Sequence, residues 1–195
     1  MNERSVVAYV STSIDGCTGG PDGVEHDQWL YEHAATTGSS MAHEPVWRRC
    51  DTAIVGRTNY EGFASVWPGI ETDPATDPDT RALAHWLNTV EKVAFSRTIT
   101  EPVWANSRIA TDVGATVREL KAAPGRDILV LNSASIVQEL LRLDLLDDLY
   151  VAIVPVVIGG GVRLLPDGLP ASRWALAGTV VMEHGAVALH WRRDR

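Results

Sequence analysis

Short apolar runs rich in β-branched residues alternate with longer polar stretches over the first two thirds of the chain. The runs cover residues 5–12, 52–55, 92–95 and 127–131, and the stretches between them are long enough to hold helices. That order is typical of parallel strands joined by crossover connections. The pattern therefore predicts an α/β protein.

Two of the connecting stretches have the periodicity of a helix. Residues 133–143 carry a broad apolar face that includes Leu140, and residues 79–89 place Trp86 with other apolar residues on one side. Residues 71–79 are acidic, broken by proline and without apolar anchors, which predicts a loop. The connections are therefore predicted to be helical, with one long exposed loop.

The last third of the chain changes character. Residues 149–157, 174–182 and 186–192 are three strand-like runs, and a turn at 183–185 joins the last two into a predicted hairpin. The chain is therefore predicted to form a mixed sheet, parallel at first and antiparallel at its C-terminal edge, with helices on both faces.

Composition and charge narrow the classes of function. With 195 residues, of which 45% are hydrophobic, we expect one domain over 1–195. A net charge of −8 without a basic run argues against nucleic acid or an anionic membrane as a partner. The longest apolar run, near 149–158, is well short of the ~20 residues that span a bilayer. Cys17 and Cys50 are far apart and fit no disulfide framework or zinc knuckle, so we expect a soluble, cytoplasmic protein.

Small polar and cationic residues follow three of the predicted strands. They are Gly56, Arg57 and Thr58 after the second run, Ser96 and Arg97 after the third, and Asn132, Ser133, Ala134 and Ser135 after the fourth. The carboxyl ends of parallel strands meet at one edge of a sheet, so these positions are predicted to converge on a nucleotide, whose 2′-phosphate suits an arginine. Each group alone also has a structural interpretation, because Ser and Asn are favoured helix N-caps.

A glycine-dense loop and a candidate acid follow the first predicted strand. Asp15 and Gly16 begin this loop, whose composition permits either closure over a ligand or an ordinary turn. Asp27 and Trp29 come next in a predicted helical region, where they offer a carboxylate and a flat apolar surface for a heterocycle. Asp27 is therefore a candidate catalytic acid, although exposed carboxylates are common on helices.

Several motifs that would indicate other chemistry are missing. No GxGxxG follows the first run, and neither GxxxxGK[ST] nor the zinc-deaminase pair of H-x-E with P-C-x-x-C occurs in the sequence. His26, His33 and His43 have no recognisable ligand spacing, so no metal site is predicted. Rossmann proteins, P-loop ATPases and zinc deaminases are therefore disfavoured.

The remaining motifs form an ordered set that resembles a known family. They read SIDG at 13–16, GRTNYE at 56–61, SRT at 96–98, NSAS at 132–135 and PVVIGGG at 155–161, together with shorter matches at Lys92 and Trp104. The set spans most of the chain. It is similar to that of the dihydrofolate-reductase-like proteins, specifically the riboflavin-biosynthesis reductase (RibD C-terminal) branch.

The resemblance implies a three-layer α/β/α fold, a homodimer and binding of NADPH across the strand ends. It also implies reduction of a pyrimidine-like or pterin-like ring, as in a 5-amino-6-(5-phosphoribosylamino)uracil reductase. If the role is in riboflavin synthesis, we expect a separate protein to carry out the preceding deamination. The C-terminal strands offer apolar surface for a dimer, although such a face can also pack inside one monomer.

The resemblance also assigns roles to individual residues. Contacts to the cofactor phosphates would fall on Gly56, Arg57 and Thr58, the adenosine phosphate side on Ser96 and Arg97, the loop beside the nicotinamide on Asp15 and Gly16, and the active-site border on Pro155, Gly159 and Gly160. Family members usually have glycine where Asn132 stands. An asparagine there could donate a hydrogen bond to phosphate or crowd the site.

Two other functions fit the same residues. A true dihydrofolate reductase needs a buried acid near the pterin, and Asp27 is the candidate. A nucleotide or heterocycle sensor or carrier would hold NADPH without consuming it. Cofactor oxidation with candidate rings separates the carrier from the reductases.

Overall fold

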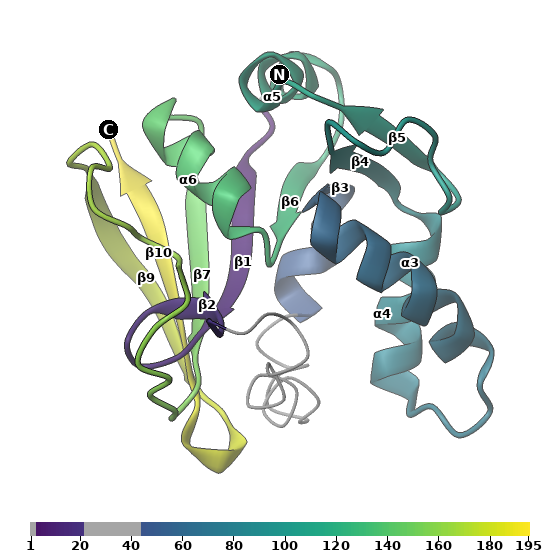
Figure 1. Cartoon of the computed structure of the whole chain (residues 1–195), viewed down its shortest axis with the longest axis horizontal. Helices are drawn as coiled ribbons and strands as arrows, with labels where there is room; N and C mark the ends of the chain where they lie inside the picture. The colour runs from purple at the N-terminus through teal and green to yellow at the C-terminus, as the bar shows by residue number, and fades with distance from the viewer. Residues whose placement is uncertain (1–2, 22–43) are drawn as a thin grey trace.

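The computed structural model describes residues 3–21 and 44–195 (Figure 1). Its elements are β1 Val6–Thr12, β2 Cys17–Gly19, β3 Cys50–Gly56, α3 Arg57–Thr72, α4 Pro78–Thr89, β4 Glu91–Phe95, β5 Ser107–Ala110, α5 Val113–Ala122, β6 Asp127–Leu131, α6 Ala134–Arg142, β7 Asp148–Ile153, β8 Val162–Arg163, β9 Arg173–Val181, the 3-10 turn η2 Glu183–Gly185 and β10 Val187–Asp194. The first four predicted strands and both predicted helices are confirmed to within two residues at each end.

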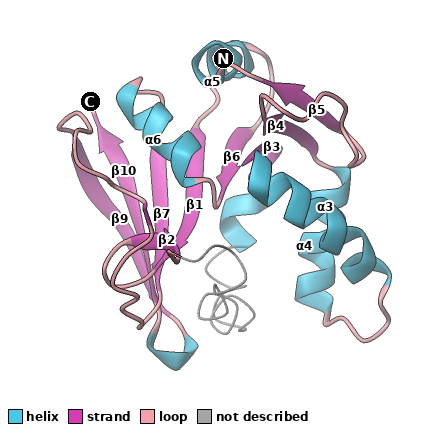
Figure 2. Cartoon of the chain, viewed as in Figure 1, coloured by secondary structure: helices cyan, strands magenta, loops and turns pink. Residues whose placement is uncertain are grey.

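Eight strands form one sheet in the order β5-β4-β3-β6-β1-β7-β10-β9 (Figure 2). Neighbouring strands are parallel from β5 to β7, whereas β10 runs antiparallel to both β7 and β9. This confirms the predicted mixed sheet with its antiparallel C-terminal edge. All residues of β1 are buried, as expected of a central strand that is covered on both faces.

Helices cover both faces of the sheet, which gives the predicted three-layer α/β/α fold. On one face Val7 belongs to a core that includes Tyr60 of α3 and Leu87 of α4. On the other face Val6 belongs to a core that includes Val137 of α6 and residues of α5. Successive side chains of a strand point to opposite faces, so β1 supplies both cores.

Some boundaries differ from the prediction, each for a local reason. The predicted loop at 71–79 is shorter, because α3 continues to Thr72 and α4 begins at Pro78 behind Asp77, whose side chain caps it. The strand predicted at 149–157 ends at Ile153, before Pro155, which has no N–H to give to a ladder. β5 and α5 were not predicted from the pattern, since β5 is short and only half buried.

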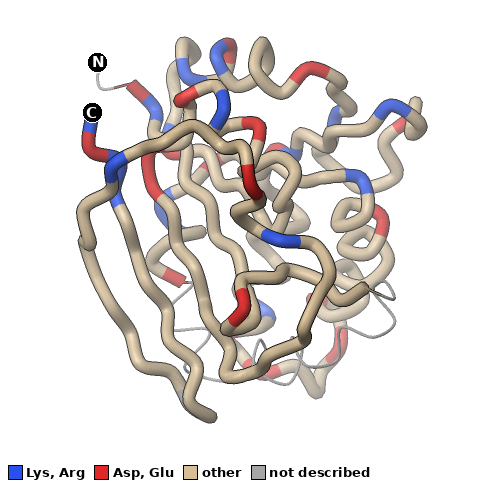
Figure 3. The backbone as a smooth tube through the Cα atoms, turned by 60° about the vertical axis from the view of Figure 1, so that its left-hand side comes forward, with Lys and Arg blue, Asp and Glu red and all other residues tan. Residues whose placement is uncertain are grey.

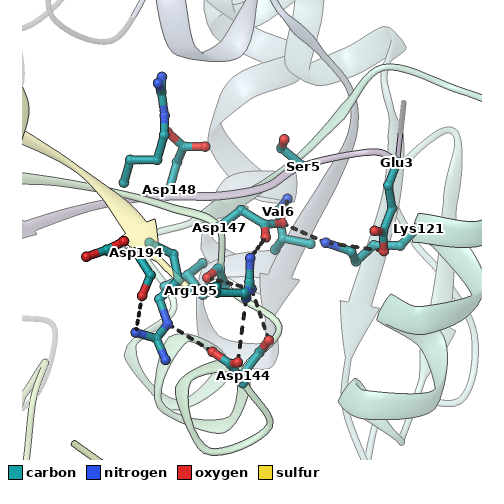
Figure 4. Close-up of polar contacts among 12 residues, drawn as sticks. Glu3, Ser5, Val6, Lys121, Asp144, Asp147, Asp148, Asp194 and Arg195 are labelled. Atoms are coloured by element: carbon teal, nitrogen blue, oxygen red, sulfur yellow. Dashed lines mark hydrogen bonds and ion pairs between the residues drawn. The ribbon is translucent and has the colours of Figure 1, made fainter. Parts of the chain in front are cut away.

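At the amino end of the sheet, Asp147 ties distant parts of the chain together (Figure 4). Its carboxylate accepts hydrogen bonds from the Val6 backbone N–H at 2.8 Å, Lys121 Nζ at 2.7 Å and Arg195 Nη1 at 2.6 Å. Burial opposes the charged form, but these donors together lower the pKa of Asp147 below its ordinary value of 3.8. The start of β1, the end of α5 and the last residue are therefore all held at the start of β7.

Candidate functional site

The carboxyl ends of β3, β6 and β1 lie side by side and are joined by side chains from the turns that follow them. The Gly56 N–H donates to Ser133 Oγ at 2.8 Å, which links β3 to the turn after β6. The Ser11 N–H donates to Asn132 Oδ1 at 3.0 Å, which links β1 to the same turn. A Cβ at position 56 would lie 3.4 Å from Ser133 Oγ, which is an ordinary contact distance, so the link between the two strand ends rests on the hydrogen bond and not on the absence of a side chain. The structure thus brings Gly56, Asn132 and Ser133 together.

Two helices begin at this edge without a side-chain cap. Neither α3, which starts after Gly56, nor α6, which starts after Ser133, has a capping hydrogen bond or an acidic residue in its first turn. By contrast, Asp77 caps α4 and Asp112 caps α5. The first N–H groups of a helix and the positive end of its dipole attract anions when no side chain satisfies them. The two uncapped starts therefore form a candidate anion site.

Ser133 shows why α6 lacks its cap. Its hydroxyl accepts from the Gly56 N–H and donates to the Leu131 carbonyl at 2.8 Å, so it serves the neighbouring strand ends instead of its own helix. The capping interpretation of this serine from sequence is therefore wrong. Ala134 is buried and Ser135 is exposed in the first turn of α6.

Asn132 adopts a left-handed backbone conformation, with φ of 43°. Glycine adopts this conformation freely, and asparagine is among the residues that tolerate it best. The side-chain oxygen is used by the Ser11 N–H, while the backbone carbonyl accepts from Asn59 Nδ2 at 2.6 Å. Asn59, in the first turn of α3, was given no role from the sequence. It holds the turn after β6 against the start of α3.

The two candidate arginines at this edge differ in their surroundings. Arg57 is exposed and forms an ion pair with Glu61 one turn along α3, at 3.0 Å. Arg97 is exposed and has no acidic partner among the described residues. Ser96 beside it accepts from the Thr98 and Ile99 N–H groups at 3.1 and 2.9 Å, so its hydroxyl shapes the turn that presents Arg97. Thr58 is exposed at the start of α3.

The loop after β1 is tied to the glycine-rich segment after β7. Asp15 Oδ2 accepts from the Gly159 N–H at 2.9 Å, and Oδ1 accepts from the Ile158 N–H at 3.2 Å. A hydrogen bond with Ser13, assisted by these two N–H groups, lowers the pKa of Asp15 below its ordinary value of 3.8. Asp15 is therefore an ionised acceptor at neutral pH that fixes the position of the 155–161 segment. Gly16 and Gly159 both have positive φ, at 78° and 75°.

The other predicted substrate-side residues are placed only in part. Pro155 is exposed and Gly160 is half buried in the segment that Asp15 holds. Asp27 and Trp29 lie outside the described residues. No helix within 3–21 and 44–195 is both long enough and apolar enough to cross a bilayer.

A polar cavity of about 430 Å³ lies at the opposite, amino end of the sheet. Each of the four arginines in its lining forms an ion pair with an aspartate. Arg49 pairs with Asp127 at 2.6 Å and with Asp148 at 3.4 Å. Open α/β sheets bind ligands outside the carboxyl ends of their strands, so the edge that holds Ser133 is the stronger candidate.

Comparison with known proteins identifies the family and the fold of the chain. A family model described as the RibD C-terminal domain matches residues 4–188. The uncharacterized protein YyaP of Bacillus subtilis is 26% identical over 197 residues, covering 98% of this chain and 97% of YyaP. A putative riboflavin biosynthesis protein from Shewanella superposes with a TM-score of 0.74 at 17% identity, over 98% of this chain and 99% of that one. Dihydrofolate reductase from Enterococcus faecalis, solved with NADP(H), superposes with a TM-score of 0.57 at 13% identity, over 98% and 97%.

Proposed function

Because the chain belongs to the RibD C-terminal domain family, we propose that it is an NADPH-dependent reductase of a pyrimidine-like or pterin-like ring. The observation that carries this proposal is the pair of uncapped helix starts at adjacent strand ends. A diphosphate has two charged groups a few ångströms apart, and two helix N-termini side by side suit such a ligand. The family relation and the dihydrofolate reductase neighbour solved with NADP(H) support the choice of cofactor.

We assign the described residues to the cofactor group by group. The N–H groups at the starts of α3 and α6, including those of Thr58 and Ser135, would hold the diphosphate. Arg97 would bind the adenosine 2′-phosphate, because its planar fork of donors matches phosphate and no acid in the described residues competes for it. Arg57 would contribute less to phosphate binding, since Glu61 already pairs with it. When bound, NADPH supplies the hydride.

The protein's own contribution would be orientation and a proton. Asp15 would hold the loop beside the nicotinamide in place through Ile158 and Gly159, and Pro155, Gly159 and Gly160 would border the substrate. Asp27 would deliver the proton and Trp29 would cover one face of the ring. The ring would resemble that of 5-amino-6-(5-phosphoribosylamino)uracil.

The test is a titration of the full chain with NADPH and with NADH, followed by tryptophan fluorescence and calorimetry. We expect Arg97→Ala to weaken NADPH binding by about tenfold or more and to leave NADH unchanged, because a charge-assisted contact to the 2′-phosphate contributes about 1.5–3 kcal/mol. Arg118→Ala on α5, also exposed, is the matched control and should change neither affinity. Failure to bind either nucleotide contradicts the proposal.

Turnover is tested separately by following NADPH oxidation with candidate pyrimidines, pterins and flavins. Oxidation with a phosphoribosylaminouracil supports the reductase of riboflavin synthesis, and oxidation with dihydrofolate supports a dihydrofolate reductase. Tight NADPH binding without oxidation by any ring indicates a carrier or sensor.

We also propose a homodimer formed through the edge strand β9. Seven of its nine residues are exposed, among them Leu176 at 60% and Val181 at 78%. An exposed apolar edge strand without internal charge invites pairing with another strand. A two-fold axis near Ala177 would pair Arg173 of one copy with Val181 of the other, so no like charges meet. Light scattering should show a dimer and Leu176→Glu a monomer; a monomeric wild type contradicts this assembly.

A further inference from the structure

A second large cavity lies on the α6 side of the sheet, away from the two uncapped helix starts. Its volume is about 720 Å³, which falls within the roughly 300–1,000 Å³ that small-molecule sites occupy. Its floor is made by Leu149, Val151 and Ile153 of β7 with Trp191 of β10, and α6 adds a wall through Leu141. The loop between β8 and β9 passes over this floor (Figure 1).

The loop that roofs the cavity is preformed. Pro166 and Pro170 restrict its backbone, and both of its ends are pinned. At one end Gln138 Nε2 of α6 donates to the Arg163 carbonyl at 2.8 Å. At the other end Arg193 Nη1 donates to the Arg173 carbonyl at 3.0 Å. The loop is therefore held over the apolar floor by hydrogen bonds at both of its ends.

The charges around this cavity differ from those at the carboxyl edge. The described residues of its lining include one cation, Arg163, and two acids, Asp15 and Asp167. Asp15 is already engaged by backbone N–H groups, as described above. No group of cations is thus available within this lining to hold a phosphate. The hairpin that borders the cavity is also almost free of charge between its ends (Figure 3).

The shape of the lining points to a flat ligand. Trp174 and Trp191 contribute two indoles, and Leu149, Val151 and Leu164 contribute aliphatic surface. Aromatic walls favour aromatic guests, since stacked and edge-to-face contacts add to the burial of area. We propose that this cavity binds a neutral, planar aromatic molecule at a site that adjoins the proposed cofactor site only at the loop of Asp15 and Gly16. The proposal does not depend on NADPH binding.

The experiment titrates the full chain with the neutral fluorescent probe N-phenyl-1-naphthylamine and follows energy transfer from tryptophan. We expect saturable binding of one probe per chain. Leu169→Lys places a charge in the half-buried part of the roof and should weaken binding by about tenfold or more. Val151→Trp should abolish binding by filling the floor. If the Val151→Trp variant fails to fold, the Leu169→Lys variant alone tests the proposal, because that substitution changes only a surface loop.

Val103→Trp is the matched control, because Val103 is 78% exposed and lies outside the cavity. It should leave probe affinity within about twofold of the wild type, and Arg97→Ala should do the same. An excess of NADPH should not displace the probe. Non-saturable binding, unchanged affinity in Leu169→Lys, or displacement by NADPH would each overturn the proposal.

Discussion

Two substitutions at Asn132 separate the stability that comes from its hydrogen bond from the stability that depends on its backbone conformation. The residue holds φ at 43°, and its side-chain oxygen accepts from the Ser11 N–H at 3.0 Å. Asn132→Gly removes the hydrogen bond but adopts the left-handed conformation freely. Asn132→Ala removes the same bond and must also hold that conformation with a Cβ.

The expected losses of unfolding free energy follow from these differences. Leaving the buried Ser11 N–H without its acceptor costs about 1–3 kcal/mol in both variants. Alanine adds a strain of about 1–2 kcal/mol in the left-handed region. Glycine avoids this strain but adds roughly 0.5–1 kcal/mol through the greater freedom of the unfolded chain. We therefore expect a loss of about 3.5 kcal/mol for alanine and about 2.75 kcal/mol for glycine.

Urea unfolding followed by tryptophan fluorescence measures both values. An alanine variant more stable than the glycine variant would refute the left-handed conformation. A loss below about 0.5 kcal/mol in both would refute the hydrogen bond to Ser11.

The same variants resolve how this asparagine affects the cofactor. The carboxamide oxygen faces β1, where the Ser11 N–H holds it, so we expect Asn132→Gly to bind NADPH no more tightly than the wild type does. A tightening of about tenfold or more in the nucleotide titration would instead show that the side chain crowds the diphosphate.

Three further predictions concern charge. Ser135→Asp puts an acid into the first turn of α6, so unfolding in urea should show a gain of about 0.3–1 kcal/mol while the NADPH titration shows a loss of affinity of about tenfold or more. Burial lowers the pKa of Lys92 from 10.5 to about 8. Between these two pH values the unfolded chain binds more protons than the folded chain, so the free energy of unfolding rises with pH. From pH 8 to 10 the wild type should gain about 2 kcal/mol of unfolding free energy relative to Lys92→Met. The pKa of Asp147 is lowered from 3.8, so its stabilisation is present above that value and lost as the pH falls through the folded pKa. Acid titration of unfolding should therefore be steeper for the wild type than for Asp147→Asn.

The sequence was most informative where burial on both faces makes a strand nearly all apolar. β6 was predicted at its observed bounds, 127–131, because each of its residues except the first is buried. β5 was missed because its four residues are half buried and carry no clear pattern. The convergence of Gly56 and Ser133 was predictable from parallel topology, since carboxyl ends share an edge.

What a side chain does at that edge was not predictable in the same way. Serine is a favoured residue for capping a helix, but the pairing of β3 with β6 brings the Gly56 N–H within reach of the Ser133 hydroxyl instead. The partner of Asn132 lies more than a hundred residues away along the chain, on β1. Tertiary contacts therefore decided both roles. The ion pair of Arg57 with Glu61 was not predicted, although its i,i+4 spacing can be read from the sequence.

The uncapped helix starts make sense as a compromise between stability and binding. A good N-cap contributes about 1 kcal/mol, and this protein has such caps where Asp77 and Asp112 begin α4 and α5. The same residue type at the starts of α3 and α6 would satisfy their N–H groups and place negative charge against any anion. The chain instead uses Ser133 to join two strand ends and leaves both helix starts open. Sites that give up local stability in this way are expected where function requires it, so gained stability with lost affinity in Ser135→Asp would connect the open helix starts to the cofactor.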